Sequence, residues 1–207
     1  MKYFAESELI INPDGSIFHL HVKPEQLADK IILVGDPGRV ALVASHFETK
    51  ECEVESREFK TITGTYKGKR ITVQSTGIGC DNIDIVVNEM DALANIDFKT
   101  RHEKETFKQL TFVRIGTCGG FFGPQGRELR IPLADPHQNE KVESFIYGDL
   151  RITNFEMESS ALAGLSALMG HKAMTCCMVI ANRVAKEANA NYKNSIDNLI
   201  IEVLDRI

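Results

Sequence analysis

Three short apolar runs, each ending in glycines, constrain the fold more than any other feature of the sequence. The runs are Lys30–Gly35 (KIILVG), Arg70–Gly79 (RITVQSTGIG) and Thr111–Gly120 (TFVRIGTCGG). Continuous runs rich in β-branched residues are typical of strands that are buried on both faces. Glycine turns at the ends of such runs indicate connections into the next element. The pattern therefore predicts a sheet that is covered on both sides.

Helical patterns separate these runs along the chain. Apolar residues at helical spacing predict helices over Asn82–Ile96, Met157–Met169 and Ile196–Ile207, and a shorter one from Arg39 to Ala44. The weak alternation of Arg57–Tyr66, followed by Lys67-Gly68-Lys69, predicts a hairpin that leads into the strand Arg70–Ser75. A further apolar strand, Met174–Ala181, completes the pattern. Strands that alternate with helices predict an α/β fold with a largely parallel or mixed sheet. Ligands of such sheets bind beyond the carboxyl ends of the strands.

The composition is that of a globular protein. The chain has 207 residues, of which 43% are hydrophobic and 26% are charged, which predicts a single domain over residues 1–207. No apolar run approaches the roughly 20 residues that a bilayer span needs. The 24 basic and 29 acidic residues give a net charge of −5, which disfavours nucleic acid and anionic membranes as partners. Any anionic ligand therefore needs a local basic cluster.

Cysteine and histidine spacing gives no sign of a metal centre. The five cysteines include no CxxC pair, and the six histidines show no spacing typical of metal ligands. Cys118 follows an apolar run but has no identifiable histidine partner, so we interpret it as a small core residue. The first residues, MKYFAESELI, lack the basic and apolar segments of a signal peptide, which predicts a cytoplasmic protein with reduced thiols.

Two arginines lie where an anion could bind. Arg39 follows the turn Gly35-Asp36-Pro37-Gly38, where backbone amides and a guanidinium suit a phosphate, although an ordinary turn with a surface arginine explains the segment equally well. Arg114 interrupts an apolar strand, and a charge buried in a sheet costs several kcal/mol unless it is paired. From the residues alone, its partner is either a structural carboxylate or a functional anion.

Two carboxylates flank Met157 just before a predicted helix. Thr153 and Glu156 fit a helix capping box, which is a purely structural interpretation. Alternatively, carboxylates beside a methionine can hold the vicinal hydroxyls of a sugar, with Glu158 taking the hydroxyl pair and Met157 forming an apolar floor. Both interpretations remain open on the sequence alone.

The run Phe121–Arg127 (FFGPQGR) places an amide and a guanidinium beside two aromatic residues. Gln125 and Arg127 would suit a heterocycle that carries amide groups. The composition of the run by itself favours a solvated turn.

Taken together and in chain order, these segments resemble the nucleoside phosphorylase family I, and within it the uridine phosphorylases. Each match is weak, but the combination is specific and covers most of the chain. The matching segments are Phe18–Leu20, Ile32–Val40, Ser56–Phe59, Ser75–Gly79, Arg114–Thr117, Phe121–Arg127 and Phe155–Ser159. The resemblance implies one α/β domain with a central mixed β-sheet flanked by helices in a three-layer sandwich.

The resemblance also implies a phosphate site. By position, its residues are Gly35, Arg39, Arg114 and Thr117, with Arg57 contributed by a neighbouring subunit. Active sites would then need at least a homodimer, and a hexamer built as a trimer of dimers is left open.

Further matches imply sites for the sugar and the base. Met157 and Glu158 would hold ribose, and His19 of a neighbouring subunit would reach the ribose 5′-hydroxyl. The uracil edge would be bound by Gln125 and Arg127, with Phe121 and Phe155 lining the base pocket. The residues expected to act in catalysis are Arg114, Arg127 and Glu158.

One position distinguishes the substrate classes in the family. Purine-specific members carry an aspartate after the strand that matches Met178–Ile180, where it donates a proton to the purine N7. This chain has Ala181-Asn182-Arg183 there. Because asparagine is not an acid, the position favours pyrimidine nucleosides.

The resemblance therefore predicts a uridine phosphorylase-like glycosyltransferase. It would cleave a pyrimidine nucleoside reversibly with phosphate, giving the free base and (deoxy)ribose 1-phosphate. Inorganic phosphate is the co-substrate, no metal or organic cofactor is needed, and a monovalent cation at a subunit interface is left open. The alternatives are a purine nucleoside phosphorylase or nucleosidase, and a non-catalytic nucleoside-binding protein.

The chain departs from the family pattern in one place. Family members carry strands and a helix between the segments that match Gly119-Gly120 and Phe121-Phe122, and this sequence has nothing there. We therefore expect a segment to be missing at the 120/121 junction.

Overall fold

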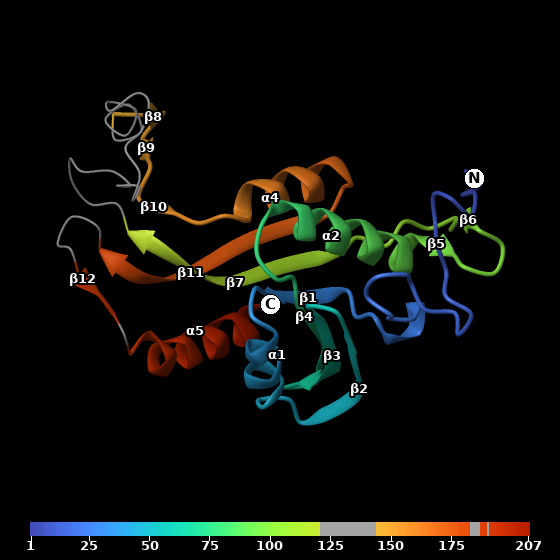
Figure 1. The fold of residues 1–207 in the computed structure, drawn as a ribbon, viewed down its shortest axis with the longest axis horizontal. Coiled ribbons are helices and arrows are strands. Elements are labelled where there is room, and N and C mark those ends of the chain that lie inside the picture. The colour runs from blue at the N-terminus through green and yellow to red at the C-terminus, as the bar shows by residue number, and fades with distance from the viewer. Residues whose placement is uncertain (121–143, 183–186, 190) are drawn as a thin grey trace. The chain divides into compact units, whose positions relative to one another are not determined.

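The structure is a computed structural model that describes residues 1–120, 144–182, 187–189 and 191–207 (Figure 1). The chain divides into two compact units. The first consists of Met1–Gly116, Met157–Cys176 and Asp197–Ile207, and the second of Thr117–Glu156 and Cys177–Ile196. The predicted base-binding residues Phe121, Gln125 and Arg127 lie outside the described residues, as does the 121 side of the predicted missing segment.

The described elements follow the predicted alternation of strands and helices. The helices are η1 (Pro24–Gln26), α1 (Pro37–Ala44), α2 (Cys80–Asn95), α4 (Ser159–Leu168) and α5 (Tyr192–Arg206). The strands are β1 (Lys30–Val34), β2 (Thr49–Ser56), β3 (Phe59–Tyr66), β4 (Lys69–Ser75), β5 (Ile96–Asp97), β6 (His102–Glu103), β7 (Thr111–Gly120), β8 (Ile146–Tyr147), β9 (Leu150–Arg151), β10 (Asn154–Phe155), β11 (Lys172–Asn182) and β12 (Glu187–Ala188).

The main sheet is mixed. Among the described strands its order is β12-β11-β7-β1-β4-β3-β2, with β10 paired to β7. Strand β1 runs parallel to β4 and β7, whereas β2, β3 and β4 are successively antiparallel. In the first unit, α2 and α4 cover one face of the sheet and α1 covers the other (Figure 1). The predicted α/β fold, a central mixed sheet flanked by helices in three layers, is confirmed.

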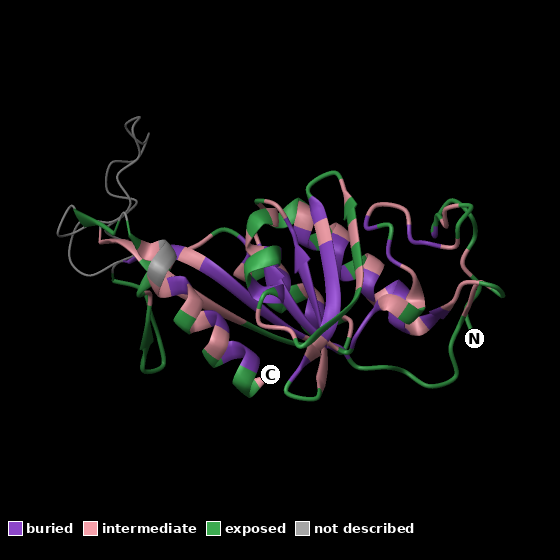
Figure 2. Cartoon of the chain, turned by 90° about the horizontal axis from the view of Figure 1, so that it is seen from below, coloured by how far each residue is buried: buried purple, intermediate pink, exposed green. Residues whose placement is uncertain are grey.

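The centre of the sheet is buried on both faces, as its continuous apolar run predicts. Residues Ile31–Val34 of β1 have no exposed surface, and the neighbouring strands are also buried (Figure 2). Ile31 and Leu33 belong to one core cluster with Leu93 of α2 and Phe112 of β7. Ile32 and Val34 point to the opposite face because side chains alternate along a strand.

One sequence interpretation is wrong at the start of α4. The helix begins at Ser159, and Glu158 is its N-cap residue. Thr153 and Glu156 precede the helix and cannot form its capping box, since a capping box needs the N-cap and the third helical residue. Glu158 is thereby the last residue before the helix, and it is nearly fully buried.

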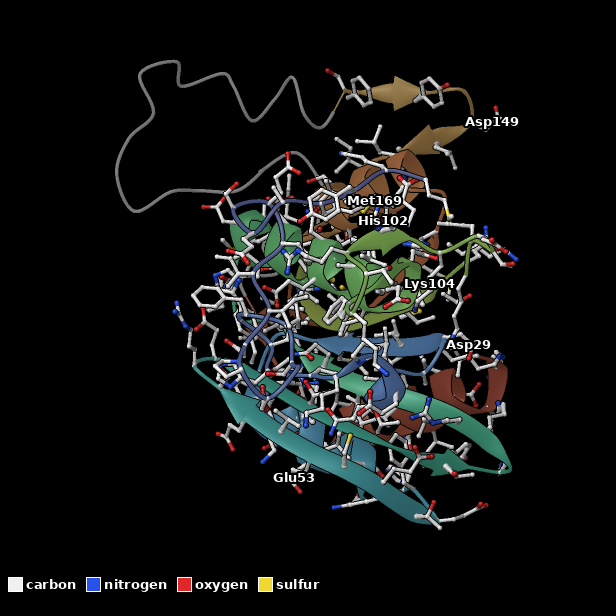
Figure 3. The ribbon with its side chains drawn as sticks, turned by 90° about the vertical axis from the view of Figure 1, so that its right-hand side faces the viewer. Asp29, Glu53, His102, Lys104, Asp149 and Met169 are labelled. Atoms are coloured by element: carbon white, nitrogen blue, oxygen red, sulfur yellow. The ribbon has the colours of Figure 1, made fainter. Side chains whose placement is uncertain are left out.

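Strand β2 was not predicted, because it carries few apolar residues. It forms one edge of the sheet, and its residues are exposed or half-buried in alternation. Glu53 projects from this edge (Figure 3) and forms an ion pair of 2.7 Å with Lys60 of β3. Charged side chains on an edge strand oppose pairing with another sheet. The polar composition of β2 is therefore typical of an edge strand.

The segment between α2 and β7 folds against the N-terminal residues. The Lys104 ammonium (labelled in Figure 3) donates to the carbonyl of Ala94 at the end of α2, at 2.8 Å, and its partial burial lowers its pKa. Arg101 donates to the Phe4 carbonyl at 2.9 Å and so fixes the first residues of the chain. Among the described residues, none of the helices has the length and apolar character that a bilayer crossing requires.

Candidate functional site

The carboxyl ends of three neighbouring strands converge in the first unit. Val34 at the end of β1 pairs with Ser75 of β4 on one side and with Ile115 of β7 on the other. Beyond β1 and β4 the chain turns through Gly35 and Gly77. A Cβ at Gly35 would lie only 3.3 Å from the Gly77 carbonyl oxygen, so the two turns approach closely.

Arg39 is held at these strand ends by helix α1. Asp36 caps the helix by accepting from the Gly38 amide at 2.8 Å, and Pro37 occupies the first helical position. The half-buried Arg39 side chain then reaches across to β7, where its Nη1 donates to the Ile115 carbonyl at 3.3 Å. This guanidinium therefore lies against the strand that carries Arg114.

Arg114 is paired with Glu158. Both side chains are 6% exposed, and the Arg114 Nη2 donates to the Glu158 Oε2. The other carboxylate oxygen of Glu158 accepts from the Gly79 amide at 2.8 Å. Gly79 has φ +98°, a conformation that L side chains rarely adopt. Of the two partners left open by the sequence, the structure thus provides the carboxylate, and that carboxylate is itself a predicted sugar-binding residue.

Gly116 makes room for the Arg114 side chain. A Cβ at Gly116 would overlap the Arg114 guanidinium, lying 3.0 Å from its Cζ and 3.2 Å from its Nη2. The guanidinium therefore folds back over the backbone of its own strand. Glycine suits position 116 because it lacks a Cβ, which lets the guanidinium approach the backbone closely. Its backbone conformation is one that other residues also adopt.

Met157 lies beside this cluster and is 57% exposed. Its carbonyl oxygen accepts from the thiol of Cys80, the first residue of α2, at 3.1 Å. The segment that carries Met157 and Glu158 is therefore tied to the Gly79–Cys80 turn by two hydrogen bonds. Of the predicted site residues, Gly35, Arg39, Arg114, Met157 and Glu158 are brought together at the strand ends of the first unit.

Two further predicted site residues lie on other segments of the first unit. Arg57 is exposed in the turn between β2 and β3, where it has φ +58°. His19 lies in the N-terminal segment, and its Nδ1 is 2.6 Å from the Glu89 Oε1 on α2. The resemblance assigns both residues to a neighbouring subunit's site, and that assignment stays a prediction.

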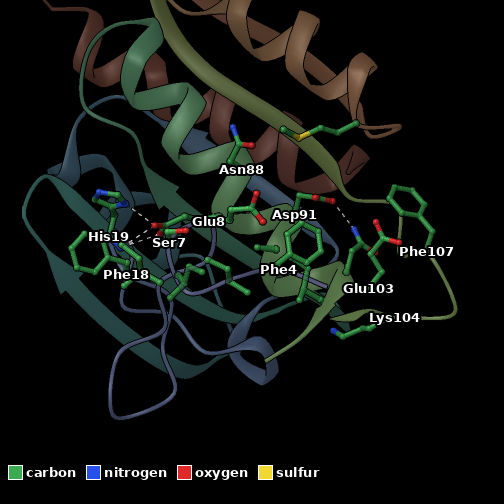
Figure 4. Close-up of a pocket in the computed structure, with 18 of the residues that line it drawn as sticks. Phe4, Ser7, Glu8, Phe18, His19, Asn88, Asp91, Glu103, Lys104 and Phe107 are labelled. Atoms are coloured by element: carbon green, nitrogen blue, oxygen red, sulfur yellow. Dashed lines mark hydrogen bonds and ion pairs between the residues drawn. The ribbon is translucent and has the colours of Figure 1, made fainter. Parts of the chain in front are cut away.

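His19 lines a pocket of about 550 Å³ in the first unit (Figure 4). Its walls come from the N-terminal segment, from α2 and from the segment before β7, and they include Phe4, Phe18 and Phe107. Asp91 of the same wall accepts from the Nε2 of His171 at 3.0 Å. The Nδ1 of His171 accepts from the Leu110 amide at 3.2 Å, so both ring nitrogens of this buried histidine are engaged by groups of the fold.

The remaining described site residues belong to the second unit. Thr117 lies in the last part of β7, and Phe155 of β10 is paired in antiparallel register with Gly119. Cys118 is buried, which confirms its interpretation as a core residue. Burial, followed by contact with Cys177, raises the pKa of its thiol to about 11, so the thiol is protonated at neutral pH and is a poor nucleophile.

Sequence reasoning missed two groups. The Gly79 amide binds Glu158, and Glu89 binds His19. The glycine turn that contains Gly79 could have indicated the amide contact. Glu89 is a single carboxylate on a helix, and no local sequence pattern marks it. In the described part of the chain, no group of three or more His, Cys, Asp or Glu side chains is placed to hold a metal ion.

Comparison with known proteins identifies the family. Residues 29–131 match the phosphorylase superfamily. A purine nucleoside phosphorylase of the DeoD type from Anoxybacillus flavithermus is 39% identical over 236 aligned positions, which cover 89% of this chain and 95% of that protein. A uridine phosphorylase from Thermococcus kodakarensis is 27% identical over 249 positions, covering 90% of this chain and 85% of that protein.

A solved structure shows the same fold. It is a nucleoside phosphorylase from Trypanosoma brucei that is described as showing uridine phosphorylase activity. The two structures agree with a TM-score of 0.79 at 23% identity, covering 96% of this chain and 100% of the other. Together with the sequence relatives, this defines the class as an α/β phosphorylase. The chain belongs to the nucleoside phosphorylase family of the phosphorylase superfamily, which confirms the prediction made from its motifs.

Proposed function

We propose that the protein is a pyrimidine nucleoside phosphorylase of the uridine phosphorylase type. It would convert uridine and phosphate reversibly into uracil and ribose 1-phosphate. The observation that carries this proposal is the Arg114–Glu158 pair at the strand ends, with the Arg39 guanidinium against the same strand. A cationic group for phosphate and a carboxylate for hydroxyls lie side by side, as the reaction between phosphate and a sugar carbon requires.

The arginines supply the phosphate half of the reaction. Guanidiniums bind phosphate through paired, charge-assisted hydrogen bonds and orient it for attack on the anomeric carbon. Arg39 and Arg114 would share this role with the backbone near Gly35 and with Thr117. Arg57 of a second subunit would complete the site, which makes a homodimer the smallest active assembly that we propose.

Glu158 and Met157 supply the sugar half. Cleavage of a glycosidic bond passes through a transition state with positive charge at the anomeric carbon. A carboxylate that accepts from the 2′ and 3′ hydroxyls fixes the ring, and its charge favours the cationic sugar. The exposed Met157 side chain next to Glu158 would form the apolar surface under the ribose.

The choice of base rests on the sequence. Gln125 and Arg127, with Phe121 and Phe155, would bind uracil and stabilise the charge that develops on it as it leaves. Asn182 supports a pyrimidine because it replaces the acid that protonates a purine. Purine phosphorolysis is the second candidate, because a relative that is 39% identical over 95% of its length is a purine nucleoside phosphorylase.

The deciding experiment follows base release from uridine and from inosine, each with and without phosphate. Release of uracil that depends on phosphate supports the proposal. Faster phosphate-dependent release of hypoxanthine would establish the purine alternative, and release without phosphate would establish a nucleosidase. Binding of uridine without turnover would establish a nucleoside-binding protein.

Two variants test the assignment of residues. Arg114→Ala should chiefly abolish the use of phosphate, and Arg127→Ala should mainly damage base recognition and departure of the leaving group. Losing one such donor raises the barrier by about 3 kcal/mol, which is a rate loss of roughly a hundredfold. Near-normal turnover of Arg114→Ala would show that phosphate binds elsewhere.

The remaining expectations belong to the same proposal. We propose a cytoplasmic enzyme that uses no organic cofactor and assembles as a dimer or as a trimer of dimers. A monovalent cation at a subunit interface would show as a dependence of activity on that ion. The alignment with the Anoxybacillus protein spans more positions than the 207 residues of this chain, so that relative has residues with no counterpart here. An intact mass above 23.1 kDa for the expressed protein would support a missing segment at the 120/121 junction, and a mass of 23.1 kDa would refute it.

A further inference from the structure

Glu89 gathers the hydrogen bonds of one turn of the N-terminal segment. Its Oε1 is 3.0 Å from the amide nitrogen of His19 and its Oε2 is 2.9 Å from that of Leu20. The Nδ1 of the His19 ring lies 2.6 Å from the same Oε1. The Glu89 side chain is 12% exposed, and dashed lines in Figure 4 mark contacts made by the labelled His19. One side chain of α2 thus holds both the backbone and the ring of His19.

A second contact fixes the plane of the ring. Phe18 and His19 pack edge to face, with centroids 4.7 Å apart and an angle of 72° between the rings. The turn itself is closed by the Ile17 amide, which donates to the Val22 carbonyl at 2.9 Å. His19 therefore has a defined ring orientation although its side chain is 29% exposed.

The Glu89 contact determines which ring nitrogen carries the proton. An ionised carboxylate only accepts hydrogen bonds, so the Nδ1 of His19 must be the donor. In the neutral ring, Nε2 is then a free acceptor, because the proton on one nitrogen is set by the partner of the other. No hydrogen bond to Nε2 is formed by the residues that the structure describes. Nε2 is thereby prepared to accept a hydrogen bond from a hydroxyl group.

We propose that Glu89 is a positioning residue for nucleoside recognition. It holds His19 in the Nδ1–H tautomer, so that Nε2 accepts a hydrogen bond from the 5′-hydroxyl of a nucleoside bound in a neighbouring subunit. This inference rests on the proposed function, which assigns His19 to that hydroxyl. It adds the residue that sets the ring's proton and orientation. Glu89 acts through His19 and does not contact the reacting atoms.

A kinetic experiment tests the role with paired substrates. The ratio of kcat/KM for uridine to that for 5′-deoxyuridine should fall about tenfold in Glu89→Gln, the size expected for one lost hydrogen bond to the substrate. Turnover of 5′-deoxyuridine and the KM for phosphate should stay within about twofold. Glu89→Gln should add nothing to His19→Ala, since coupled residues are not additive. If inosine is the better substrate, the same pair is made with 5′-deoxyinosine.

A matched control separates this role from a structural one. Asp84→Asn removes an exposed carboxylate from the same helix and should leave the substrate ratio unchanged. An equal loss of turnover on both substrates in Glu89→Gln would mean that Glu89 only supports the fold, and an unchanged ratio would also overturn the proposal. If Glu89→Gln fails to fold, Glu89→Asp keeps the charge, shortens the reach and should lower the same ratio.

A spectroscopic measurement makes the inference independent of turnover. Two-bond ¹H–¹⁵N NMR spectra of the imidazole should show His19 as the Nδ1–H tautomer in the wild-type protein, and a shift towards Nε2–H in Glu89→Gln. An Nε2–H tautomer in the wild type would overturn the proposal. If the spectra confirm the Nδ1–H tautomer but no turnover depends on phosphate, the proposed function is refuted and the role of Glu89 in setting the tautomer is not.

Discussion

Glu158 and Glu89 each hold one basic side chain and one or more backbone amides, but they do so at different depths. The Arg114–Glu158 pair lies at the strand ends with both side chains 6% exposed, whereas His19 is 29% and Glu89 12% exposed. In the buried pair each charge depends on its partner, because water cannot replace it. In the more exposed His19–Glu89 pair, water can replace part of each hydrogen bond. Glu89 therefore affects the orientation of the His19 ring more than the stability of the protein.

The comparison also separates two functions of a carboxylate. Glu158 is tied to Arg114 on one side and to the Gly79 amide on the other, so both oxygens are engaged before a ligand arrives. Glu89 is engaged by the His19–Leu20 turn, while the Nε2 of the His19 ring receives no hydrogen bond from the described residues. We expect variants of the first pair to change stability together with the binding of phosphate or of the sugar, and variants of the second to change substrate preference with little effect on stability.

The largest effect is expected for Glu158→Gln. The substitution keeps the shape but leaves the buried Arg114 without this counter-charge, which should lower the free energy of unfolding by about 3–5 kcal/mol. Urea denaturation measures the change. Glu53→Gln, in an ion pair whose carboxylate side chain is 49% exposed, is the control and should move the urea midpoint far less than Glu158→Gln, because water screens that pair. Equal losses in the two variants would remove the distinction between deep and shallow pairs.

The second effect tests burial farther along β7 with an uncharged group. The folded protein holds the pKa of the Cys118 thiol at about 11, above the ordinary 9.0, because the site disfavours a thiolate. The folded state therefore keeps a proton that the unfolded chain loses, and stability falls as the pH rises from about 9 to 11. The expected difference from Cys118→Ala is about 2–3 kcal/mol across this range. Parallel pH profiles of the two proteins would show that burial does not act on this thiol.

The third effect asks whether Arg114 needs the space above Gly116. Gly116→Ala would place a methyl group on the guanidinium and should cost about 1–3 kcal/mol while weakening phosphate use. Gly164→Ala is the matched control, since that glycine is exposed in α4 and a Cβ there meets nothing within 4 Å. The control should be neutral or stabilising by up to about 1 kcal/mol because alanine favours a helix. Thermal unfolding of both variants would sharpen the contrast, and equal melting temperatures would contradict it.

The smallest effect is expected at the shallow pair. Glu89→Gln should lower the free energy of unfolding by about 1 kcal/mol, because the amide keeps one acceptor and water reaches the site. Asp84→Asn should stay within about 0.5 kcal/mol of the wild type. A loss as large as that of Glu158→Gln would show that Glu89 is part of the core and would weaken its assignment as a positioning residue.

The sequence predicted the centre of the fold well and its edge poorly. Strands β1 and β7 are continuous apolar runs because they are buried on both faces, and a run of this kind can be recognised without knowing its neighbours. The edge strand β2 is polar, which opposes pairing with another sheet, and a polar strand gives no such signal. The capping-box interpretation of Thr153 and Glu156 was wrong because these residues satisfy a local rule that the chain does not use there, since α4 begins at Ser159.

The candidate site divides in the same way. Arg39, Arg114 and Glu158 could be picked out because a charge inside or beside an apolar run needs an explanation. That Arg114 and Glu158 bind each other could not be predicted, since 44 positions separate them along the chain. Glu89 could not be predicted at all, because a glutamate on a helix is usually exposed and solvated.

The sequence by itself determined the alternation of strands and helices, the glycine turns at the strand ends and the residue types that suit phosphate and a sugar. These depend on local periodicity and backbone freedom, which neighbouring residues carry. Only the tertiary structure decided which carboxylate meets which cation, and how deeply. Those pairings join α4 to β7 and α2 to the N-terminal segment, and contacts between distant segments depend on packing that local patterns do not specify.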